Sequence, residues 1–409
     1  MRWYWIGAIL ASAALLGGFT TVAGGPAAGA IKPQAPALLY VAPATSRATL
    51  SPRCQNAPYI DINAAIDTAV AGDTIVVCPG TYTGFMPIAT SSSDQPTITT
   101  GVEINKSIHL IGLPGATINA AGLDNGVTFD DVSNATLRGF TITGAIGEGV
   151  LAMVSTEITI KDNSVDNNDG GTATSGYAEC RTTSGTQGDC GFGIHLLSVT
   201  NSNVIDNTVE RDSGGILLTD EYGPTHGNSV NGNLVEEDRT YSGIKLAGCI
   251  DTALSSQGQR TAVMGGVYDN AIANNVVTSD GTAGLGAGIL LTASVRGGGS
   301  YDNVVVRNEI SDNGLAGVMI EKHFALSDVS GNVLASNRIG TNNVVGEPAD
   351  ALTTGILVGR DQLSFQPIAA TVYDNTIASD HYGIFDNAGT PDLTRFGNHF
   401  KKVIVSVGV

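Results

Sequence analysis

Two short patterns recur along the chain and alternate with each other, and they restrict the fold more than any other feature. The first is a glycine followed by an apolar residue at the next position and, in most copies, at the third; it begins at Gly149, Gly193, Gly215, Gly243, Gly288, Gly317, Gly355 and Gly383. The second is Asn-x-Val or Asn-x-Ile, at Asn163, Asn207, Asn233, Asn275, Asn308, Asn337 and Asn375. Apolar residues at every second position are typical of strands, not helices. The patterns therefore predict many short strands separated by turns.

The spacing between successive glycines of the first pattern is irregular. It ranges from 22 residues, between Gly193 and Gly215, to 45 residues, between Gly243 and Gly288. Strands that recur while the turns between them vary in length are typical of a parallel β-helix, in which coils stack at about 4.8 Å. A β-sandwich is the alternative, but the paired recurrence of both patterns favours the β-helix.

Each pattern has an expected role in such a coil. The inward Ile, Val and Leu side chains are expected to form one continuous dry column. Asparagines at equivalent turns would stack and hydrogen-bond from coil to coil, which satisfies backbone groups at the bend. The glycine before each strand is expected to supply the backbone freedom that a tight corner needs.

The segment from Tyr59 to Gly84 predicts the start of the solenoid. Its apolar positions Ile62, Ala65, Ile66 and Ala69 have the spacing of a short amphipathic helix. Gly72 and Asp73 are expected to end this helix, and Thr74 to Cys78 to form the first strand. A helix here would cap the open end of the first coil, whose strand edges would otherwise be exposed.

The first residues have the pattern of a secretory signal peptide. Arg2 precedes an apolar run from Trp3 to Leu16, and small residues follow as far as Ala30. A membrane anchor is the alternative, but the run is shorter than the roughly 20 residues that a spanning helix needs. We expect residues 1–30 to be a signal peptide, residues 31–58 an N-terminal linker and residues 59–409 the β-helix domain. The expected location is secreted or at the cell surface, with no membrane insertion after signal removal.

The charge balance excludes several partners. The chain carries 38 acidic and 20 basic side chains, for a net charge of −18. Such a field repels nucleic acid and anionic membrane surfaces. It also repels polyanionic glycans unless metal cations bridge the two.

Five cysteines fit an oxidising compartment. Cys54 and Cys78 bracket one short element and Cys180 and Cys190 bracket one loop, so proximity favours these two pairs. Cys249 is then left over, either buried or free.

The stretch AAIDTAVAGDTIVVCPGTY, residues 64–82, and the two repeated patterns resemble secreted, right-handed parallel β-helix proteins of the pectin-lyase-like superfamily. The resemblance extends from about Tyr59 to Phe400. It implies an all-β, right-handed parallel β-helix solenoid with an N-terminal capping helix. The superfamily contains polysaccharide lyases, glycoside hydrolases, uronate epimerases, tailspikes and adhesins, so the fold does not choose the activity.

In such a fold, residues two positions after each repeated glycine point outward and form one column. The column is mostly apolar and is therefore expected to be covered by a loop or to form a binding platform; it reads Leu151, His195, Leu217, Lys245, Leu290, Met319, Leu357 and Phe385. His195 and Lys245 interrupt it on either side of the strand at Gly215. Stacked coils would place them within about 10 Å of each other.

Polar residues gather where the neighbouring strands end. We predict a catalytic site made of His195, Asp220, Glu221, Tyr222, His226 and Lys245. The proposed base is His195, Tyr222 or Lys245, and Asp220 or Glu221 would act as acid, nucleophile or metal ligand. Substrate-binding residues are expected at the following strand ends, namely Lys322, His323, Arg360 and Asp361. The insertions 172–190 and 249–266 would wall a cleft. The alternative is that Asp220 and Glu221 only cap a turn.

A second column of carboxylates predicts a cation site. It consists of Glu210, Asp212, Glu236 and Asp238, followed by Asp280. Stacked carboxylates repel one another unless they are protonated or bridged, and Ca²⁺ takes oxygen ligands of this kind. The alternative is that these residues form turns, and the recurrence of Asp or Asn five residues after each repeated asparagine favours it for Asp212 and Asp238.

The sequence selects no activity of the superfamily. The signatures of pectin hydrolases and uronate epimerases are absent as sets, and a copper-delivery role is disfavoured by five Met and six scattered His. We therefore predict a carbohydrate-active protein that cleaves an extracellular polysaccharide by lyase or hydrolase chemistry. The alternative is a non-catalytic glycan-binding or cell-surface structural protein.

Overall fold

The computed structural model describes most of the chain beyond the N-terminal segment. The described residues are 35–44, 51–88, 97–168, 191–249, 265–283, 286–293, 295–322, 324, 326–346, 352–360, 368–387 and 393–408. They belong to one compact unit, Pro36–Val409, apart from Ala35. The expected signal peptide, residues 1–30, lies outside the described residues.

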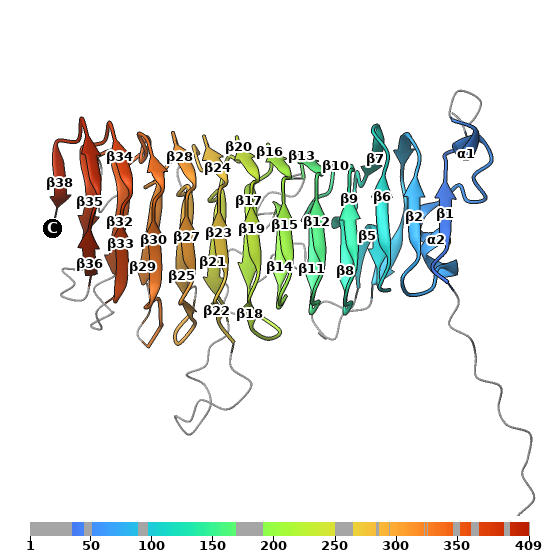
Figure 1. Ribbon diagram of the computed structural model, residues 1–409, viewed down its shortest axis with the longest axis horizontal. Coiled ribbons are helices and arrows are strands. Elements are labelled where there is room, and N and C mark those ends of the chain that lie inside the picture. Colours follow the sequence, from blue (N-terminus) through green and yellow to red (C-terminus); the bar gives the residue numbers. More distant parts are fainter. Residues whose placement is uncertain are drawn as a thin grey trace, which may run out of the picture. The chain divides into compact units, whose positions relative to one another are not determined.

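Three long sheets run side by side through this unit, and Figure 1 shows their strands succeeding one another in chain order. Sheet A has twelve strands: β1 (Leu38–Val41), β2 (Thr74–Val77), β6 (His109–Gly112), β9 (Thr136–Arg138), β12 (Thr159–Lys161), β15 (Asn203–Ile205), β19 (Ser229–Asn231), β23 (Ala271–Ala273), β27 (Val304–Val306), β30 (Asn332–Ala335), β33 (Ala370–Tyr373) and β36 (Leu393–Phe396).

Sheet B follows sheet A in each coil. Its eleven strands are β3 (Gly80–Tyr82), β7 (Ala116–Asn119), β10 (Thr141–Thr143), β13 (Ser164–Asp166), β16 (Thr208–Glu210), β20 (Leu234–Glu236), β24 (Val276–Thr278), β28 (Glu309–Ser311), β31 (Arg338–Ile339), β34 (Thr376–Ala378) and β37 (His399–Lys401).

Sheet C completes the coil and contains the Gly-initiated repeats. Its twelve strands are β4 (Met86–Ile88), β5 (Ile98–Ile104), β8 (Asn125–Asp130), β11 (Val150–Met153), β14 (Phe192–Leu197), β17 (Gly214–Thr219), β21 (Ile244–Gly248), β25 (Ile289–Ala293), β29 (Val318–Lys322), β32 (Thr354–Arg360), β35 (Tyr382–Asp386) and β38 (Val405–Gly408). A small sheet D, made of β18 (Thr225–His226), β22 (Val267–Tyr268) and β26 (Ser300–Tyr301), precedes sheet A in three coils.

Strand pairing confirms the predicted parallel β-helix and excludes the β-sandwich. Within each sheet, neighbouring strands come from successive coils and pair in parallel, as Ile194 does with Ile216 and Ile216 with Ile244. The antiparallel pair is β4 with β5, at the N-terminal end of sheet C. Residues that lie far apart in the sequence are therefore neighbours along the stack.

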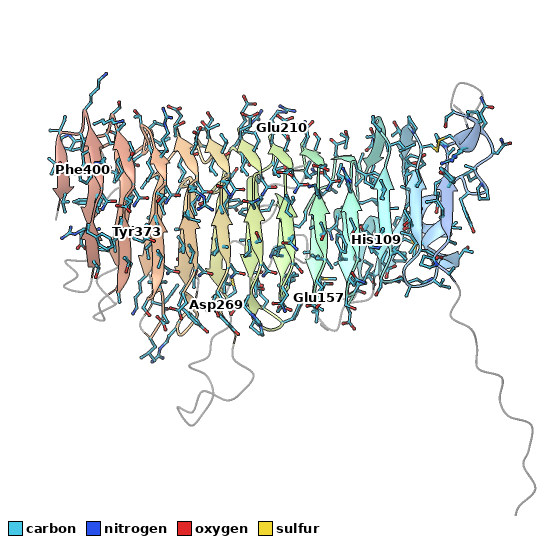
Figure 2. All side chains as sticks on the ribbon, viewed as in Figure 1. His109, Glu157, Glu210, Asp269, Tyr373 and Phe400 are labelled. Atoms are coloured by element: carbon cyan, nitrogen blue, oxygen red, sulfur yellow. A yellow bond between two sulfur atoms is a disulfide. The ribbon has the colours of Figure 1, made fainter. Side chains whose placement is uncertain are left out.

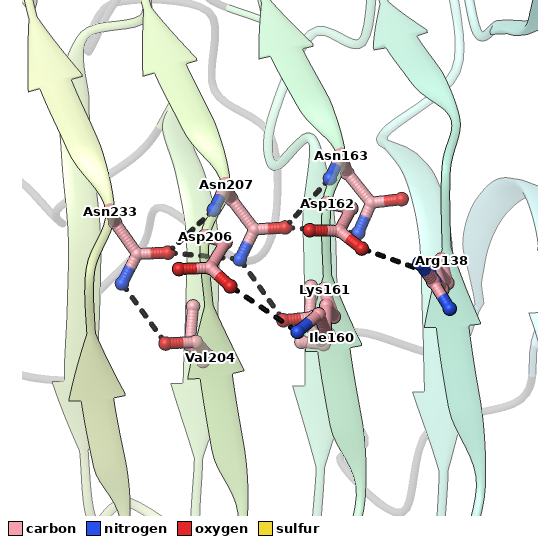
Figure 3. Close-up of polar contacts among 9 residues, drawn as sticks. All are labelled: Arg138, Ile160, Lys161, Asp162, Asn163, Val204, Asp206, Asn207 and Asn233. Carbon is pink, nitrogen blue, oxygen red and sulfur yellow. Dashed lines mark hydrogen bonds and ion pairs between the residues drawn. The ribbon is translucent and has the colours of Figure 1, made fainter. Parts of the chain in front are cut away.

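The corner between sheets A and B follows from two residue types. A residue with positive φ, such as Asp162 or Asp206, turns the chain, and an asparagine follows it directly. Asn163 donates from its backbone N and from Nδ2 to Asn207 Oδ1, both at 3.0 Å, and Asn207 does the same to Asn233. Figure 3 shows this asparagine ladder, in which Asn207 Nδ2 also donates to the carbonyl oxygen of Ile160 on the preceding coil. The predicted stacking of asparagines is confirmed.

Ion pairs flank the ladder on the outer surface. Arg138 contacts Asp162 at 2.9 Å, and Lys161 contacts Asp206 at 3.2 Å (Figure 3). These side chains are partly exposed, so each pair is expected to contribute less than about 1 kcal/mol. The corner therefore depends mainly on the buried amides.

The interior is one column of Ile, Val and Leu side chains from all three sheets. Ile194, Ile216 and Ile244 in sheet C are completely buried, as are Val165 and Val209 in sheet B. Burial of apolar area at about 25 cal/mol per Å² makes this column the main source of stability.

The repeated glycines serve a different purpose from the one expected. Gly149, Gly193 and Gly215 are not among the residues with positive φ, so the corner does not require their backbone freedom. A Cβ on Gly215 would instead lie 2.3 Å from the carbonyl oxygen of Gly243 and 2.3 Å from a methyl group of Val235. These glycines are needed because the next coil and the inward side chains of sheet B pass too closely for any side chain.

The N-terminal end has the predicted capping helix, α2 (Ile62–Thr68), whose buried face includes Ile62, Ala65 and Ile66. Asp61 caps its first turn by accepting a hydrogen bond from Ala64 N. A short helix, α1 (Pro52–Gln55), precedes it. The expectation that Thr74 begins the first strand is wrong, because β1 pairs with β2 one coil earlier. Residues 31–58, expected as a linker, therefore contribute β1 and α1 to the folded unit.

One predicted disulfide is present, between Cys54 and Cys78, with the Cα atoms 5.9 Å apart. It joins α1 to the end of β2. Cys180 and Cys190 lie outside the described residues.

Lys106 stabilises the C-terminal end of α2. Its Nζ donates to the carbonyl oxygens of Ile66, Asp67 and Ala69 at 2.9, 2.7 and 3.1 Å. Lys106→Met should lower the free energy of unfolding by about 1–3 kcal/mol, because these helix-end carbonyls lose a charged donor. Lys161→Met, which removes only a surface ion pair, is the matched control in thermal denaturation. Equal melting temperatures for the two variants would contradict this role for Lys106.

Candidate functional site

The outer face of sheet C carries the predicted site column. Strand register places Leu151 beside His195, His195 beside Leu217 and Leu217 beside Lys245. Leu151 and Leu217 are almost completely buried. The face around His195 is therefore covered and not an open platform.

Glu148, Thr219 and His195 form a polar cluster within this apolar column. The His195 Nε2 atom lies 2.7 Å from the hydroxyl oxygen of Thr219, and Nδ1 lies 3.6 Å from Glu148 Oε1. His195 is 8% exposed and Glu148 is 3% exposed. Both nitrogens of the imidazole are thus oriented by side chains from neighbouring coils.

Glu221 extends this cluster towards solvent. The residue lies in the turn after β17 and is exposed. Desolvation nevertheless raises the pKa of its carboxyl group, while the charge of His195 and a hydrogen bond with Thr219 oppose that increase. Glu221 therefore lies at the edge of the covered face, with its carboxyl group directed to the buried residues His195 and Thr219.

Asp220 and Tyr222, on either side of Glu221, have different surroundings. Asp220 is fully buried, and its Oδ1 accepts a hydrogen bond from Cys249 N at 2.5 Å. This hydrogen bond joins the turn after β17 to the end of the next sheet C strand, β21. Tyr222 is 50% exposed, and its backbone N donates to Ser198 Oγ at 2.9 Å.

His226 belongs to another part of the surface. Its ring stacks on Tyr268 at 4.8 Å, and Tyr268 stacks on Tyr301 at 5.1 Å. These three rings form an aromatic column on sheet D. The structure therefore does not bring His226 together with His195.

The other predicted cations lie farther along sheet C. Lys245 is two coils from His195, about 10 Å along the stack. Lys322 is buried at the end of β29 and lies in register with Arg360, the last residue of β32. His323 and Asp361 lie outside the described residues, as do 172–190 and most of 249–266.

The four residues expected to bind calcium divide into two groups. Glu210 and Glu236 lie in register on the outer side of sheet B, where Figure 2 labels Glu210. Arg211 contacts Glu210 at 2.6 Å and Asp166 at 2.8 Å, so its guanidinium group bridges these two carboxylates.

Asp212 and Asp238 instead occupy a second ladder, at the corner between sheets B and C. Asp212 N donates to Asp238 Oδ1 at 2.8 Å, and Asp238 N donates to Asp280 Oδ1 at 3.0 Å. Burial raises the pKa of Asp238 well above its ordinary value, and repulsion from Asp280 and Asp212 adds to this; burial also raises the pKa of Asp280. Among the described residues, no cluster of three or more His, Cys, Asp or Glu side chains is arranged to hold a metal ion.

The same ladder continues with asparagines, which shows how the aspartates fit into it. Asn313 N donates to Asn342 Oδ1, and Nδ2 of Asn313 reaches the carbonyl oxygen of Val277 at 3.3 Å. An aspartate at an equivalent rung has an oxygen in place of this donor. The Oδ2 atoms of Asp238 and Asp280 are buried and have no hydrogen-bond partner among the described residues.

Comparison with known proteins agrees with the geometry. The family described as "Periplasmic copper-binding protein (NosD)" matches residues 67–256. The A-module of mannuronan C-5 epimerase AlgE4 from Azotobacter vinelandii has 15% sequence identity and a TM-score of 0.54, over 85% of this chain and 92% of that one. Pectate lyase Pel9A has 15% identity and a TM-score of 0.52, over 89% of this chain and 80% of that one. The chain has the right-handed parallel β-helix fold of pectin-lyase-like proteins. No curated protein sequence matches it.

The described histidines of the matched segment are not gathered into one copper site. His109 lies on sheet A, His195 on sheet C and His226 on sheet D, and Cys78 is in a disulfide. Copper sites need soft ligands gathered in one place, which these residues do not provide. The part of the chain that the structure describes contains no helix long and apolar enough to cross a membrane.

The sequence patterns missed two members of the His195 cluster. Glu148 directly precedes Gly149, at a position that other coils fill with Phe192, Gly214, Ser242, Ala287 and Ala316. Glu148 is the acidic residue at this position, whereas the residues named for the other coils are uncharged. Comparing the residues that precede each repeated glycine would therefore have identified it. Thr219 offers no comparable signal, because threonine on a strand is ordinary.

Proposed function

We propose that this β-helix protein is exported and cleaves an extracellular polysaccharide at the outer face of sheet C. The observation that supports the proposal is the connected set Glu148, His195, Thr219 and Glu221, which joins two carboxyl groups through an imidazole and a hydroxyl group. Acid–base groups held together in a covered, largely apolar face are typical of catalytic sites.

In this proposal, Glu221 and His195 have complementary roles. The raised pKa of Glu221 keeps its carboxyl group protonated at a higher pH than an ordinary glutamate, as a general acid requires. His195, oriented by Glu148 and Thr219, is the general base that removes a proton from water in hydrolysis or from the sugar ring in a lyase reaction. Lys245, two coils away, would contact the glycan beyond the cleaved bond.

Location and calcium are separate parts of the proposal. The disulfide between Cys54 and Cys78 supports folding in an oxidising compartment outside the cytoplasm. Calcium stays a prediction, which activity measured with and without EDTA tests.

A non-catalytic, glycan-binding role is the second candidate, and one observation favours it. The imidazole of His195 is almost completely covered and already contacts side chains through both nitrogens. A structural histidine would show the same environment.

The two candidates differ in the products that they leave. The purified protein is incubated with neutral and uronate polysaccharides, and both reducing ends and the absorbance of unsaturated products are followed. We expect His195→Ala to reduce the cleavage rate by about a hundredfold, the effect of losing a general base. His109→Ala is the matched control, because His109 Nδ1 also lies 3.0 Å from a threonine hydroxyl, that of Thr136, but on sheet A.

The pH profile tests Glu221. A general acid must be protonated, so activity should fall as the pH rises through the raised pKa of Glu221. Glu221→Gln should remove this alkaline limb and lower the maximum rate. Retention on a glycan without any product would reject the enzymatic proposal in favour of binding. Equal cleavage rates for His195→Ala and His109→Ala would reject His195 as the general base.

A further inference from the structure

A hollow on the outer face of sheet B, over the last coils, is separate from the sheet C site. Its volume is about 560 Å³, and its lining includes Arg338, Gly340, Thr376, Ala378 and Lys401. Ala378 lies in register with Lys401. Gly340 has no side chain and Ala378 has only a methyl group, so little side-chain volume fills the space near Arg338 and Lys401. Figure 2 shows the C-terminal end of the stack, where Phe400, the neighbour of Lys401, is labelled.

The two cations at the hollow lack an anionic partner. Arg338 and Lys401 are both exposed, and neither forms an ion pair with any residue that the structure describes. Glu309 lies in register with Arg338 on the preceding coil without forming an ion pair with it. In the middle coils, by contrast, Arg211 on the same side of the stack is neutralised by Glu210 and Asp166.

The rest of the lining is suited to hydroxyl groups. Ser311, Thr341 and Thr376 contribute hydroxyls, and Asp312 contributes a carboxylate. Asp312 opposes binding of a bare anion but accepts hydrogen bonds from sugar hydroxyls. The volume lies within the range of about 300–1,000 Å³ that small-molecule sites occupy.

We propose that this hollow is a second, non-catalytic site that binds acidic sugar residues through their carboxylates. Arg338 would hold a carboxylate through its two parallel N–H donors, and Lys401, two coils farther along the stack, would contact the same or the next acidic group. On a chain with net charge −18, such a site provides the local positive charge that an acidic glycan needs. The choice of a sugar as ligand rests on the proposed function, whereas the choice of an anion rests on the two cations alone.

Binding is measured by calorimetry on the full chain carrying His195→Ala, so that no substrate is consumed. The probes are a defined oligouronate, its carboxyl-reduced neutral counterpart and inorganic phosphate. Arg338→Gln with Lys401→Gln should weaken binding of the oligouronate at least tenfold. Arg138→Gln with Arg307→Gln is the matched control, since it removes the same charge from sheet A and its corner. All four positions are exposed, and melting temperatures verify folding.

The outcomes separate this inference from the proposed function. Equal affinity of the hollow variant and the control for oligouronate, or equal binding of the neutral counterpart, would overturn it. Binding of phosphate alone would also overturn it, because the site would then recognise a free anion and not a sugar. Binding that depends on Arg338 and Lys401 in a protein that cleaves nothing would support the hollow while rejecting the proposed enzyme.

Discussion

Asp238→Asn combined with Asp280→Asn is expected to stabilise the protein at neutral pH by about 2–6 kcal/mol. Each substitution replaces a buried oxygen that lacks a partner among the described residues with the amide donor that neighbouring rungs use. A buried polar atom without a hydrogen bond costs about 1–3 kcal/mol, and stacked ionised carboxylates add repulsion. Asparagine has the same shape as aspartate, so the ladder keeps its geometry.

The pH dependence of stability should change with the same variant. Burial raises the pKa of Asp238 and Asp280 above the ordinary value of 3.8, so the folded protein binds more protons than the unfolded chain above that pH. Their stabilising contribution is therefore complete below pH 3.8 and is lost as the pH rises through the folded pKa values. The double variant should lose this decline, and its advantage should grow with pH.

Thermal denaturation from acid to neutral pH measures both effects. Asp312→Asn is the control for each single substitution, because it removes one carboxylate at an exposed position. A double variant whose melting temperature at neutral pH equals or falls below that of the wild type would show that the ladder needs aspartate.

Asn275→Leu is expected to have the largest opposite effect, a loss of about 3–6 kcal/mol. Asn275 Oδ1 accepts from the backbone N and Nδ2 of Asn233 at 2.9 and 3.0 Å, and its Nδ2 donates to Val230 O and Asn308 Oδ1, both at 3.0 Å. Leucine fills the same space but leaves at least two buried donors of Asn233 without partners, at about 1–3 kcal/mol each.

The control for this variant lies in the same coil. Thr278→Val removes a half-buried hydroxyl on the outer face of sheet B and should cost less than about 1 kcal/mol. Chemical denaturation of the two variants gives the comparison. Similar midpoints would mean that the ladder contributes no more than an ordinary surface hydrogen bond.

The fold could be predicted from the sequence because its repeats carry local chemistry. An asparagine equivalent to Asn207 recurs in the middle coils because the hydrogen bonds of the corner need its amide. A glycine equivalent to Gly215 recurs because the next coil passes too close for a side chain. The reason for the glycines was harder to predict, because the obstacle comes from the neighbouring coil and not from the backbone of Gly215 itself.

The candidate site was predictable only as a column. Alternation placed His195 and Lys245 on one outward face, and the strand register confirms that placement. The contacts of Glu148 with His195, and of Thr219 with both His195 and Glu221, depend on how far side chains reach between coils. His226 was grouped with the site because it closely follows Asp220, Glu221 and Tyr222 in the sequence, but it lies on β18 of sheet D.

The asparagine ladder also affects how such a chain can change in length. The rung from Asn233 to Asn275 is bridged by the same pair of hydrogen bonds as the rung from Asn275 to Asn308. Duplication or deletion of one whole coil would place two asparagines next to each other and restore the same two hydrogen bonds at this corner. Loss of part of a coil would not. Genes for molecules of this kind can therefore grow or shrink by complete windings without redesign of the joint.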